Sequence, residues 1–267
     1  MSRPLFLISA VLAFALQTAT LAGYAADTTA LKAPKQNWSF NGPFGRYDRA
    51  SLQRGFQVYR EVCAACHGLN YVHFKDLSAP GGPGFDEAAL RNIMASFQLP
   101  AGPNDKGETT DDNGAPLMRS AKLSDSIPSP FANDQAARAA NNGMLPQDMS
   151  LIVKARAGGA DYIYALLTGY TDAPHGFTMA QGMNYNPYFA GRAIAMVPPL
   201  ADDTVTYGDG TKATLAQQAR DVTTFLAWAS DPARETRQRI GFEVIAFLIW
   251  FAGLIALCTR KVWKDAP

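Results

Sequence analysis

Residues Cys63-Ala64-Ala65-Cys66-His67 are the part of this sequence whose residue types and spacing most directly indicate a chemistry. A C-x-x-C-H sequence is the attachment signature of a c-type haem. Thiols at this spacing reach the two vinyl groups of one porphyrin edge and form thioethers, and the histidine that follows lies under the iron. We therefore expect one covalently bound haem c, attached through Cys63 and Cys66, with His67 as an axial ligand of the iron.

Two other uses of paired cysteines explain this motif less well. A thioredoxin-like C-x-x-C pair is expected near a βαβ pattern, and no such pattern surrounds residues 63–66. A structural zinc site needs a second pair of Cys or His ligands. The third and last cysteine, Cys258, lies far away in an apolar segment, so neither a zinc site nor a disulfide scaffold is favoured.

The second axial ligand is less constrained by spacing. His73, His175 and the seven internal methionines carry suitable atoms. Met196 is favoured because it lies in the apolar run 193–200, whose two prolines would hold a thioether in a stiff, dry segment. Met183, in a polar context, is the main alternative. His/Met coordination would give the haem a high reduction potential.

Two amphipathic stretches indicate the helices that would position this motif. Apolar residues at helical spacing predict a helix over residues 48–62, which leads into the attachment cysteine, and another over residues 214–230. The first stripe consists of Leu52, Phe56, Tyr59 and Cys63. We expect a mainly α-helical, cytochrome c-like haem domain with long loops. Residues 81–84 and 103–114 are expected to be surface excursions.

The two ends of the chain carry apolar segments of different length. The run 5–16 follows Arg3 and precedes small residues, a pattern typical of a signal peptide over residues 1–25. The run 240–258 holds a single charge, and at about 1.5 Å per residue it approaches the ~30 Å of a hydrocarbon core. We therefore expect a C-terminal transmembrane anchor over residues 234–259. The alternatives are an uncleaved N-terminal anchor and a buried core helix.

The orientation in the membrane follows from the signal peptide. Basic residues flank the apolar run equally on both sides, so the positive-inside rule does not decide. An exported N-terminus would make residues 26–233 a periplasmic haem domain and residues 260–267 a cytoplasmic stub. The expected location is the inner membrane, with a single pass.

Overall composition excludes two other classes of protein. The 267 residues include 24 Lys and Arg against 23 Asp and Glu, for a net charge of +1. No basic excess is available to neutralise phosphates, so a nucleic-acid partner is not expected. An apolar fraction of 48% excludes global disorder.

Several longer motifs resemble one family. In chain order they are Arg54-Gly55-Phe56-Gln57-Val58-Tyr59, Ala139-Ala140-Asn141-Asn142-Gly143, Leu145-Pro146, residues 155–162, residues 166–170, Asn186-Pro187-Tyr188-Phe189 and the Met196 segment. Together with the haem motif they resemble the cytochrome c1 family, the haem subunits of cytochrome bc1 complexes, in an alphaproteobacterium-like form. The resemblance runs from Trp38 to the anchor.

This resemblance implies roles for individual residues. It makes Met196 the second axial ligand, in agreement with the choice made from its context. It places Arg156 near the haem propionates, where a guanidinium would pair with a carboxylate. The remaining residues of the haem pocket would be Asn141, Pro146 and Tyr162. Taken alone, Arg156 would be interpreted as a solvated loop cation and Tyr162 as an ordinary packed tyrosine.

The resemblance also implies a function. The chain would be the electron-transfer subunit of a quinol:cytochrome c reductase, taking electrons from a Rieske iron–sulfur protein and passing them to a soluble or membrane-anchored cytochrome c. It would lie beside cytochrome b in a dimeric complex, and it would itself make or break no substrate bond.

Two alternative functions differ in what they require. A membrane-anchored cytochrome c that serves a terminal oxidase would lack the long loops and the motifs around Asn141 and Arg156. A haem peroxidase-like enzyme would have an open iron site, which binding of carbon monoxide or cyanide would reveal.

Overall fold

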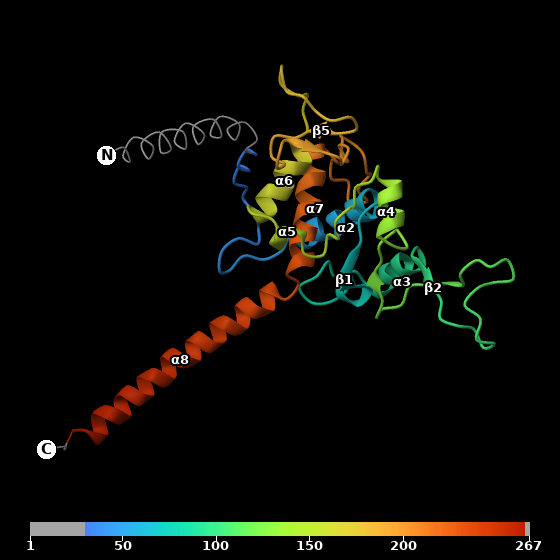
Figure 1. The fold of residues 1–267 in the computed structure, drawn as a ribbon. Helices are drawn as coiled ribbons and strands as arrows, with labels where there is room; N and C mark the ends of the chain where they lie inside the picture. Colours follow the sequence, from blue (N-terminus) through green and yellow to red (C-terminus); the bar gives the residue numbers. More distant parts are fainter. Residues whose placement is uncertain (1–29, 265–267) are drawn as a thin grey trace, which may run out of the picture.

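Two helices that cross near the centre of the fold pack against each other in its core (Figure 1). The structure is a computed structural model that describes residues 30–264. Helix α2 spans Arg49–Glu61, and helix α7 spans Leu215–Ser230. The helices touch at Gly55, where an added Cβ would lie only 2.1 Å from the backbone oxygen of Asp221. A residue larger than glycine would therefore force the two helices apart.

Both central helices begin where the sequence predicts. Asp48 accepts a hydrogen bond from the Ser51 N–H at 3.0 Å, and Thr214 caps α7 in the same way. The apolar stripes face the core: Leu52, Phe56, Tyr59, Ala219, Val222 and Leu226 are each 2% exposed or less. The two predicted helices are thus confirmed.

Short elements joined by long loops complete the described part of the chain. The other helices of the body are α3 (Glu87–Ala95), α4 (Asp134–Ala140), α5 (Ile152–Ala155) and α6 (Gly159–Thr168). The strands are β1 (Leu69–His73), β2 (Gln98–Pro100), β3 (Met118–Ser120), β4 (Ser126–Ile127), β5 (Asn184–Tyr185) and β6 (Ala193–Ile194). They form antiparallel pairs of β1 with β4, β2 with β3, and β5 with β6. Two 3-10 turns cover Cys63–Ala65 and Phe74–Leu77. The mainly α-helical class with long loops is confirmed.

The segment before α2 is tied to α6, which itself packs against α7. Asp161 on α6 accepts a hydrogen bond from the Trp38 indole N–H at 2.7 Å and another from the Gln36 N–H at 3.0 Å. The same carboxylate pairs with Lys35 at 3.1 Å. Because this carboxylate is nearly buried, its three partners fix the N-terminal segment against the body.

The expectation that residues 81–84 form a surface excursion is wrong. Gly82 and Pro83 are buried, and an added Cβ at Gly82 would lie 3.1 Å from the Trp228 side chain. The Gly82 carbonyl accepts a hydrogen bond from Arg49 at 2.7 Å, and the Pro83 carbonyl accepts one from Gln53 at 3.0 Å. This stretch packs against α2 and α7 because its small residues allow the backbone to approach them closely.

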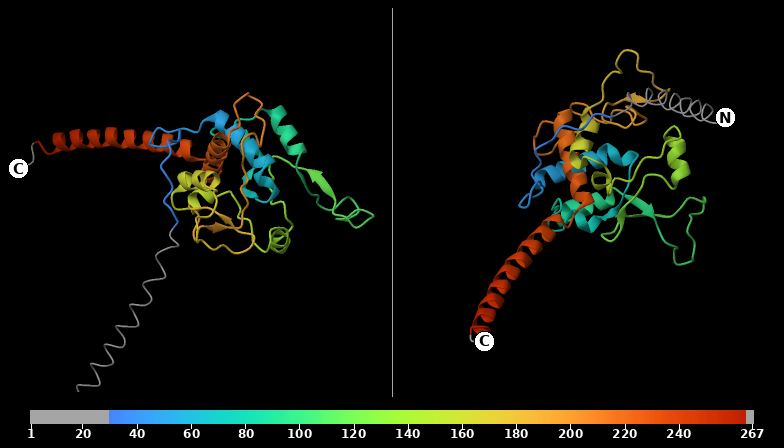
Figure 2. Two further views of the ribbon diagram at one scale, coloured as in Figure 1. Left: turned by 90° about the horizontal axis from the view of Figure 1, so that it is seen from above. Right: turned by 60° about the vertical axis from the view of Figure 1, so that its left-hand side comes forward.

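The loop over residues 103–114 is exposed, as predicted. It joins β2 to β3, and its turns are closed by its own backbone and side chains, including Asp111, whose carboxylate accepts from Asn113 N and Ala115 N. In both views of Figure 2 this hairpin extends from the body on the side away from the C-terminal helix α8 (Arg234–Val262).

Helix α8 (Arg234–Val262) projects from the body as a long rod (Figure 1). Among the described residues it is the one helix long and apolar enough to cross a membrane, and none of its apolar window is buried. Its last residues, 260–262, continue the helix into the expected cytoplasmic stub. The expected signal peptide, residues 1–25, lies outside the described residues.

Candidate haem-binding site

The attachment motif follows directly on the end of α2. The N–H groups of Cys66 and His67 both donate to the Cys63 carbonyl, at 3.1 and 2.9 Å, which closes a tight 3-10 turn. Cys63 is 9% exposed and Cys66 is half-buried. Because α2 is held by its stripe against α7, this turn is a fixed platform for the two thiols and the imidazole.

The environment of Cys63 argues against a redox-active dithiol. Both cysteines are free of disulfides, and burial raises the pKa of the Cys63 thiol to about 12. Reactive C-x-x-C pairs need a thiol whose pKa is lowered. A neutral thioether suits a buried apolar position, so this environment fits covalent haem attachment.

The imidazole of His67 is oriented by a contact from a distant segment. Its Nδ1 lies 2.7 Å from the Gln147 carbonyl oxygen. A carbonyl only accepts, so Nδ1 carries the proton and Nε2 keeps a free lone pair for a metal. Burial lowers the pKa of His67, which favours the neutral, ligating form. The Tyr59 hydroxyl also donates to the His67 carbonyl at 2.9 Å.

The segment around Gln147 packs along the chain that follows His67. The Met149 N–H donates to the Gly68 carbonyl at 2.9 Å, and Asp148 accepts from the Asn70 N–H at 2.9 Å. These bonds bring half-buried Pro146, a predicted pocket residue, beside the attachment turn. Helix α4 precedes this segment in the chain and ends at Ala140, with Asn141 as its C-terminal cap.

Asn141 closes α4 rather than projecting freely. It is the C-terminal cap of that helix, and its side-chain amide donates to the Ala137 carbonyl at 2.7 Å. Its side chain is half-buried. Asn141 therefore helps to shape the loop that ends at Pro146 and Gln147.

Met196 follows β6 and is half-buried. Two distant side chains donate to its backbone oxygen: the Tyr170 hydroxyl at 3.1 Å and the Asn184 amide at 3.4 Å. Burial raises the pKa of Tyr170, so its hydroxyl remains protonated and able to donate. We call this arrangement the Met196 clamp.

Met183, the rival ligand, lies directly before β5, and Met196 lies two residues after β6. Asn184 pairs with Ile194 across these strands, so both methionines lie at the same end of the strand pair. Both methionines are half-buried. The difference between them is the clamp, which fixes the backbone of Met196.

The two other histidines are poor candidates for the iron. His73 is 42% exposed at its side chain and faces Asp76, with 3.4 Å between Nδ1 and the carboxylate. His175 is exposed in a loop.

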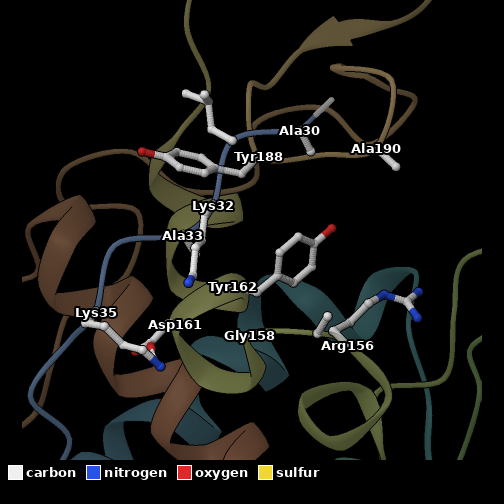
Figure 3. Close-up of a pocket in the computed structure, with 12 residues that line it drawn as sticks. Ala30, Lys32, Ala33, Lys35, Arg156, Gly158, Asp161, Tyr162, Tyr188 and Ala190 are labelled. Carbon is white, nitrogen blue, oxygen red and sulfur yellow. Dashed lines mark ion pairs between the residues drawn. The ribbon is translucent and has the colours of Figure 1, made fainter. Parts of the chain in front are cut away.

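Arg156 and Tyr162 line a cavity of about 420 Å³ between α6 and the N-terminal segment (Figure 3). Arg156 is exposed, and among the described residues no carboxylate pairs with it. Burial raises the pKa of Tyr162, and the positive charge of Arg156 opposes that rise. Cys63, Cys66, His67 and Met196 do not line this cavity. The structure thus brings Arg156 and Tyr162 together at this cavity, whose lining does not include the attachment turn.

A family model settles the class of protein to which this site belongs. The model of the cytochrome C1 family matches residues 38–266. The chain belongs to the cytochrome c1 family. Members carry a covalently bound haem c, and Cys63 and Cys66 supply the attachment cysteines of this chain.

Individual cytochromes c1 match over most of the chain. Cytochrome c1 of Blastochloris viridis is 41% identical over 97% of this chain and 95% of its own length. The cytochrome b-c1 complex catalytic subunit of Candida albicans is 48% identical over 82% of this chain and 73% of its own. Cytochrome b/c1 of Bradyrhizobium diazoefficiens is 44% identical over 97% of this chain, which spans 39% of that longer protein.

The site also contains residues that sequence reasoning missed. Gln147 acts through its backbone carbonyl, which carries no residue-type signal. Tyr59 was predicted to be part of a core stripe, and its hydroxyl bond to His67 could not be seen there. Tyr170 lies in a stretch that resembles the family, and Asn184 lies just before another, but neither residue type indicated a contact with Met196. The donors that are present fit a haem c: two thiols, an imidazole with a free Nε2, and a thioether on a fixed backbone.

Proposed function

We propose that this chain is the electron-transfer subunit of a cytochrome b-c1 complex, with His67 and Met196 as the axial ligands of its haem iron. The observation that carries the proposal is the His67 hydrogen bond to Gln147, which presents Nε2 from the turn that also holds both attachment cysteines. The Met196 clamp supports the choice of the second ligand.

When bound, the haem supplies one-electron chemistry, its iron alternating between the ferrous and ferric states. The residues of the chain would keep the axial ligands in place while the charge of the iron changes. Gln147 fixes the imidazole plane, and the Met196 clamp fixes the thioether segment. Arg156 is proposed to pair with a propionate, and Asn141, Pro146 and Tyr162 to complete the pocket. A rigid, closed site of this kind favours electron transfer over ligand binding.

The chain is anchored in the membrane by helix α8, the one candidate span among the described residues. We further propose that the haem domain, residues 26–233, lies on the periplasmic side and that the chain ends in the cytoplasm. The signal-peptide pattern of residues 1–25 supports this orientation.

Membership of a membrane complex is supported by the names of the relatives. We propose cytochrome b as the neighbour of α8. The Bradyrhizobium relative is named for both cytochromes and is more than twice the length of the matched part, which supports this partner. We also propose the remaining partners that the family resemblance implies. They are a Rieske iron–sulfur protein as electron donor and a soluble or anchored cytochrome c as acceptor, within a dimeric complex.

Affinity purification of the full-length, tagged chain from detergent-solubilised membranes tests this assignment. We expect b-type haem and an iron–sulfur protein to co-purify with the covalent c-type haem. A chain that purifies with c-type haem alone, or with a terminal oxidase, would contradict the proposed complex and favour the anchored-carrier alternative.

A further inference from the structure

A turn just before α2 exposes an aromatic ring beside the start of the membrane helix. Phe44 is 76% exposed, and its ring centroid lies 5.9 Å from that of Phe242 on α8, with the rings edge to face. Phe242 is itself 63% exposed. The pair thus presents two aromatic faces outward from the junction between body and anchor.

The turn that carries Phe44 is ordered by its own backbone. The Gly45 N–H donates to the Gly42 carbonyl at 3.4 Å, and the Arg46 N–H donates to the Ser39 carbonyl, just before the turn, at 3.0 Å. Gly42 has a φ of +80°, and a Cβ at Gly45 would lie 2.2 Å from the Asn41 oxygen. Phe44 is therefore held outward by a tight turn instead of folding into the core.

The first turns of α8 are bonded to the same turn. Arg234 donates to the Phe40 carbonyl at 2.7 Å, and Gln238 donates to the Gly42 carbonyl at 3.1 Å. The Glu235 carboxylate accepts from the Tyr47 N–H at 2.9 Å and from the Arg49 guanidinium at 3.0 Å. The turn and the helix start form one unit, so the depth of α8 in a bilayer sets the depth of Phe44.

The length of α8 places that unit at the membrane surface. From Phe242 to Arg260 is about 27 Å at ~1.5 Å per residue, close to the ~30 Å hydrocarbon thickness. Trp263 is 71% exposed and follows Arg260 and Lys261. Aromatic and basic residues of this kind mark a membrane interface. With Trp263 at one interface, Phe242 and the adjacent Phe44 lie at the other.

Arg46 adds a charge suited to the same surface. It is exposed, and no carboxylate among the described residues pairs with it. Guanidinium groups bind phosphate readily through paired N–H donors.

We propose that the turn over residues 41–46 is a second membrane contact, in which Phe44 inserts at the headgroup–acyl boundary and Arg46 binds lipid phosphate. The inference goes beyond the proposed electron transfer and does not depend on the identity of the haem ligands.

Spin labels test this contact in the assembled protein. Phe44→Cys would be labelled in a full-length Cys258→Ser background, within the purified complex, in vesicles of phosphatidylethanolamine and phosphatidylglycerol with the haem kept reduced. Label accessibility to oxygen, which partitions into lipid, is compared with accessibility to a water-soluble nickel chelate. We expect the oxygen-to-nickel ratio at position 44 to be several-fold higher than at Met118→Cys, an exposed β3 position on the hairpin directed away from α8.

A label at Ile249→Cys, which is 69% exposed on α8, is the reference for lipid. A ratio at position 44 that matches Met118→Cys while Ile249→Cys reports lipid would overturn the proposal and leave the anchor intact. Low accessibility to both probes would also overturn it, because it would mean that a protein subunit covers the turn.

Photo-crosslinking of the unsubstituted chain with a diazirine phospholipid is an independent test. We expect lipid to be crosslinked within residues 41–46, and the absence of crosslinked lipid there would count against the contact.

Discussion

The Nδ1 of His67 lies 2.7 Å from the carbonyl oxygen of Gln147, a residue 80 positions further along the chain. The ligand of the proposed iron is therefore oriented by a segment that is remote in sequence and is itself bonded to residues 68–70. Orientation of a metal-binding histidine through its second nitrogen raises its basicity and fixes its plane. The loop between the attachment motif and Met196 thus contributes directly to the site.

The choice between Met196 and Met183 is tested by two matched substitutions. Met196→Leu should abolish the near-infrared sulfur-to-iron band and lower the midpoint potential by a sizeable part of the ~0.8 V range that axial ligands control. Met183→Leu should leave both unchanged. Absorption spectra and redox titration of the full-length protein measure this. Loss of the band in the Met183 variant alone would move the ligand to that residue.

Removal of one donor of the Met196 clamp should loosen the ligand without removing it. Tyr170→Phe deletes a hydrogen bond worth about 1 kcal/mol. We expect the near-infrared band to persist and cyanide to bind the oxidised haem about fivefold more tightly, because the thioether is displaced more easily. Tyr185→Phe on β5 is the control, since its hydroxyl bonds no other described residue. Equal cyanide affinity in the two variants would show that the clamp does not act on the ligand.

Arg156 should stabilise the negative edge of the haem. Arg156→Gln would lose a charge-assisted hydrogen bond, worth about 1 kcal/mol once solvent exposure is allowed for. We expect a lower thermal midpoint and measurable carbon monoxide binding to the reduced haem. Lys32→Gln removes the same charge from the same cavity and should have neither effect. Identical behaviour of the two variants would make Arg156 a surface cation.

The crossing of α2 and α7 should not tolerate a methyl group. Gly55→Ala would place a Cβ 2.1 Å from Asp221 O and 2.7 Å from the Phe225 Cβ. Such overpacking costs about 1–3 kcal/mol in the free energy of unfolding. Gly208→Ala, where a Cβ would meet nothing within 4 Å, is the control. Thermal melting followed by haem absorbance should show a lower midpoint for Gly55→Ala, and equal midpoints would mean that the helices separate at little cost.

The predictable parts of this fold are those set by local pattern. The α2 and α7 stripes repeat at helical spacing, and Asp48 and Thr214 are strong capping residues, so both helices could be placed closely from sequence. The attachment motif is equally local. Its chemistry follows from five consecutive residues.

Features that depend on distant contacts were not predictable in this way. Gly82 and Pro83 have the composition of an exposed turn, yet bonds from Arg49 and Gln53 hold them against the core. The Gln147 carbonyl and the Met196 clamp likewise depend on loops whose path no periodicity encodes. The roles of Arg156, Asn141 and Tyr162 came from family resemblance, and they remain predictions.

The most direct test of the central claim is quinol-driven reduction of the covalent haem in native membranes. We expect added quinol to reduce the c-type haem attached through Cys63 and Cys66, an inhibitor of quinol oxidation to block this, and added ferric cytochrome c to reoxidise the haem. A reduced-minus-oxidised spectrum in which quinol leaves this haem ferric, while dithionite reduces it, would contradict the assignment to electron transfer in a cytochrome b-c1 complex.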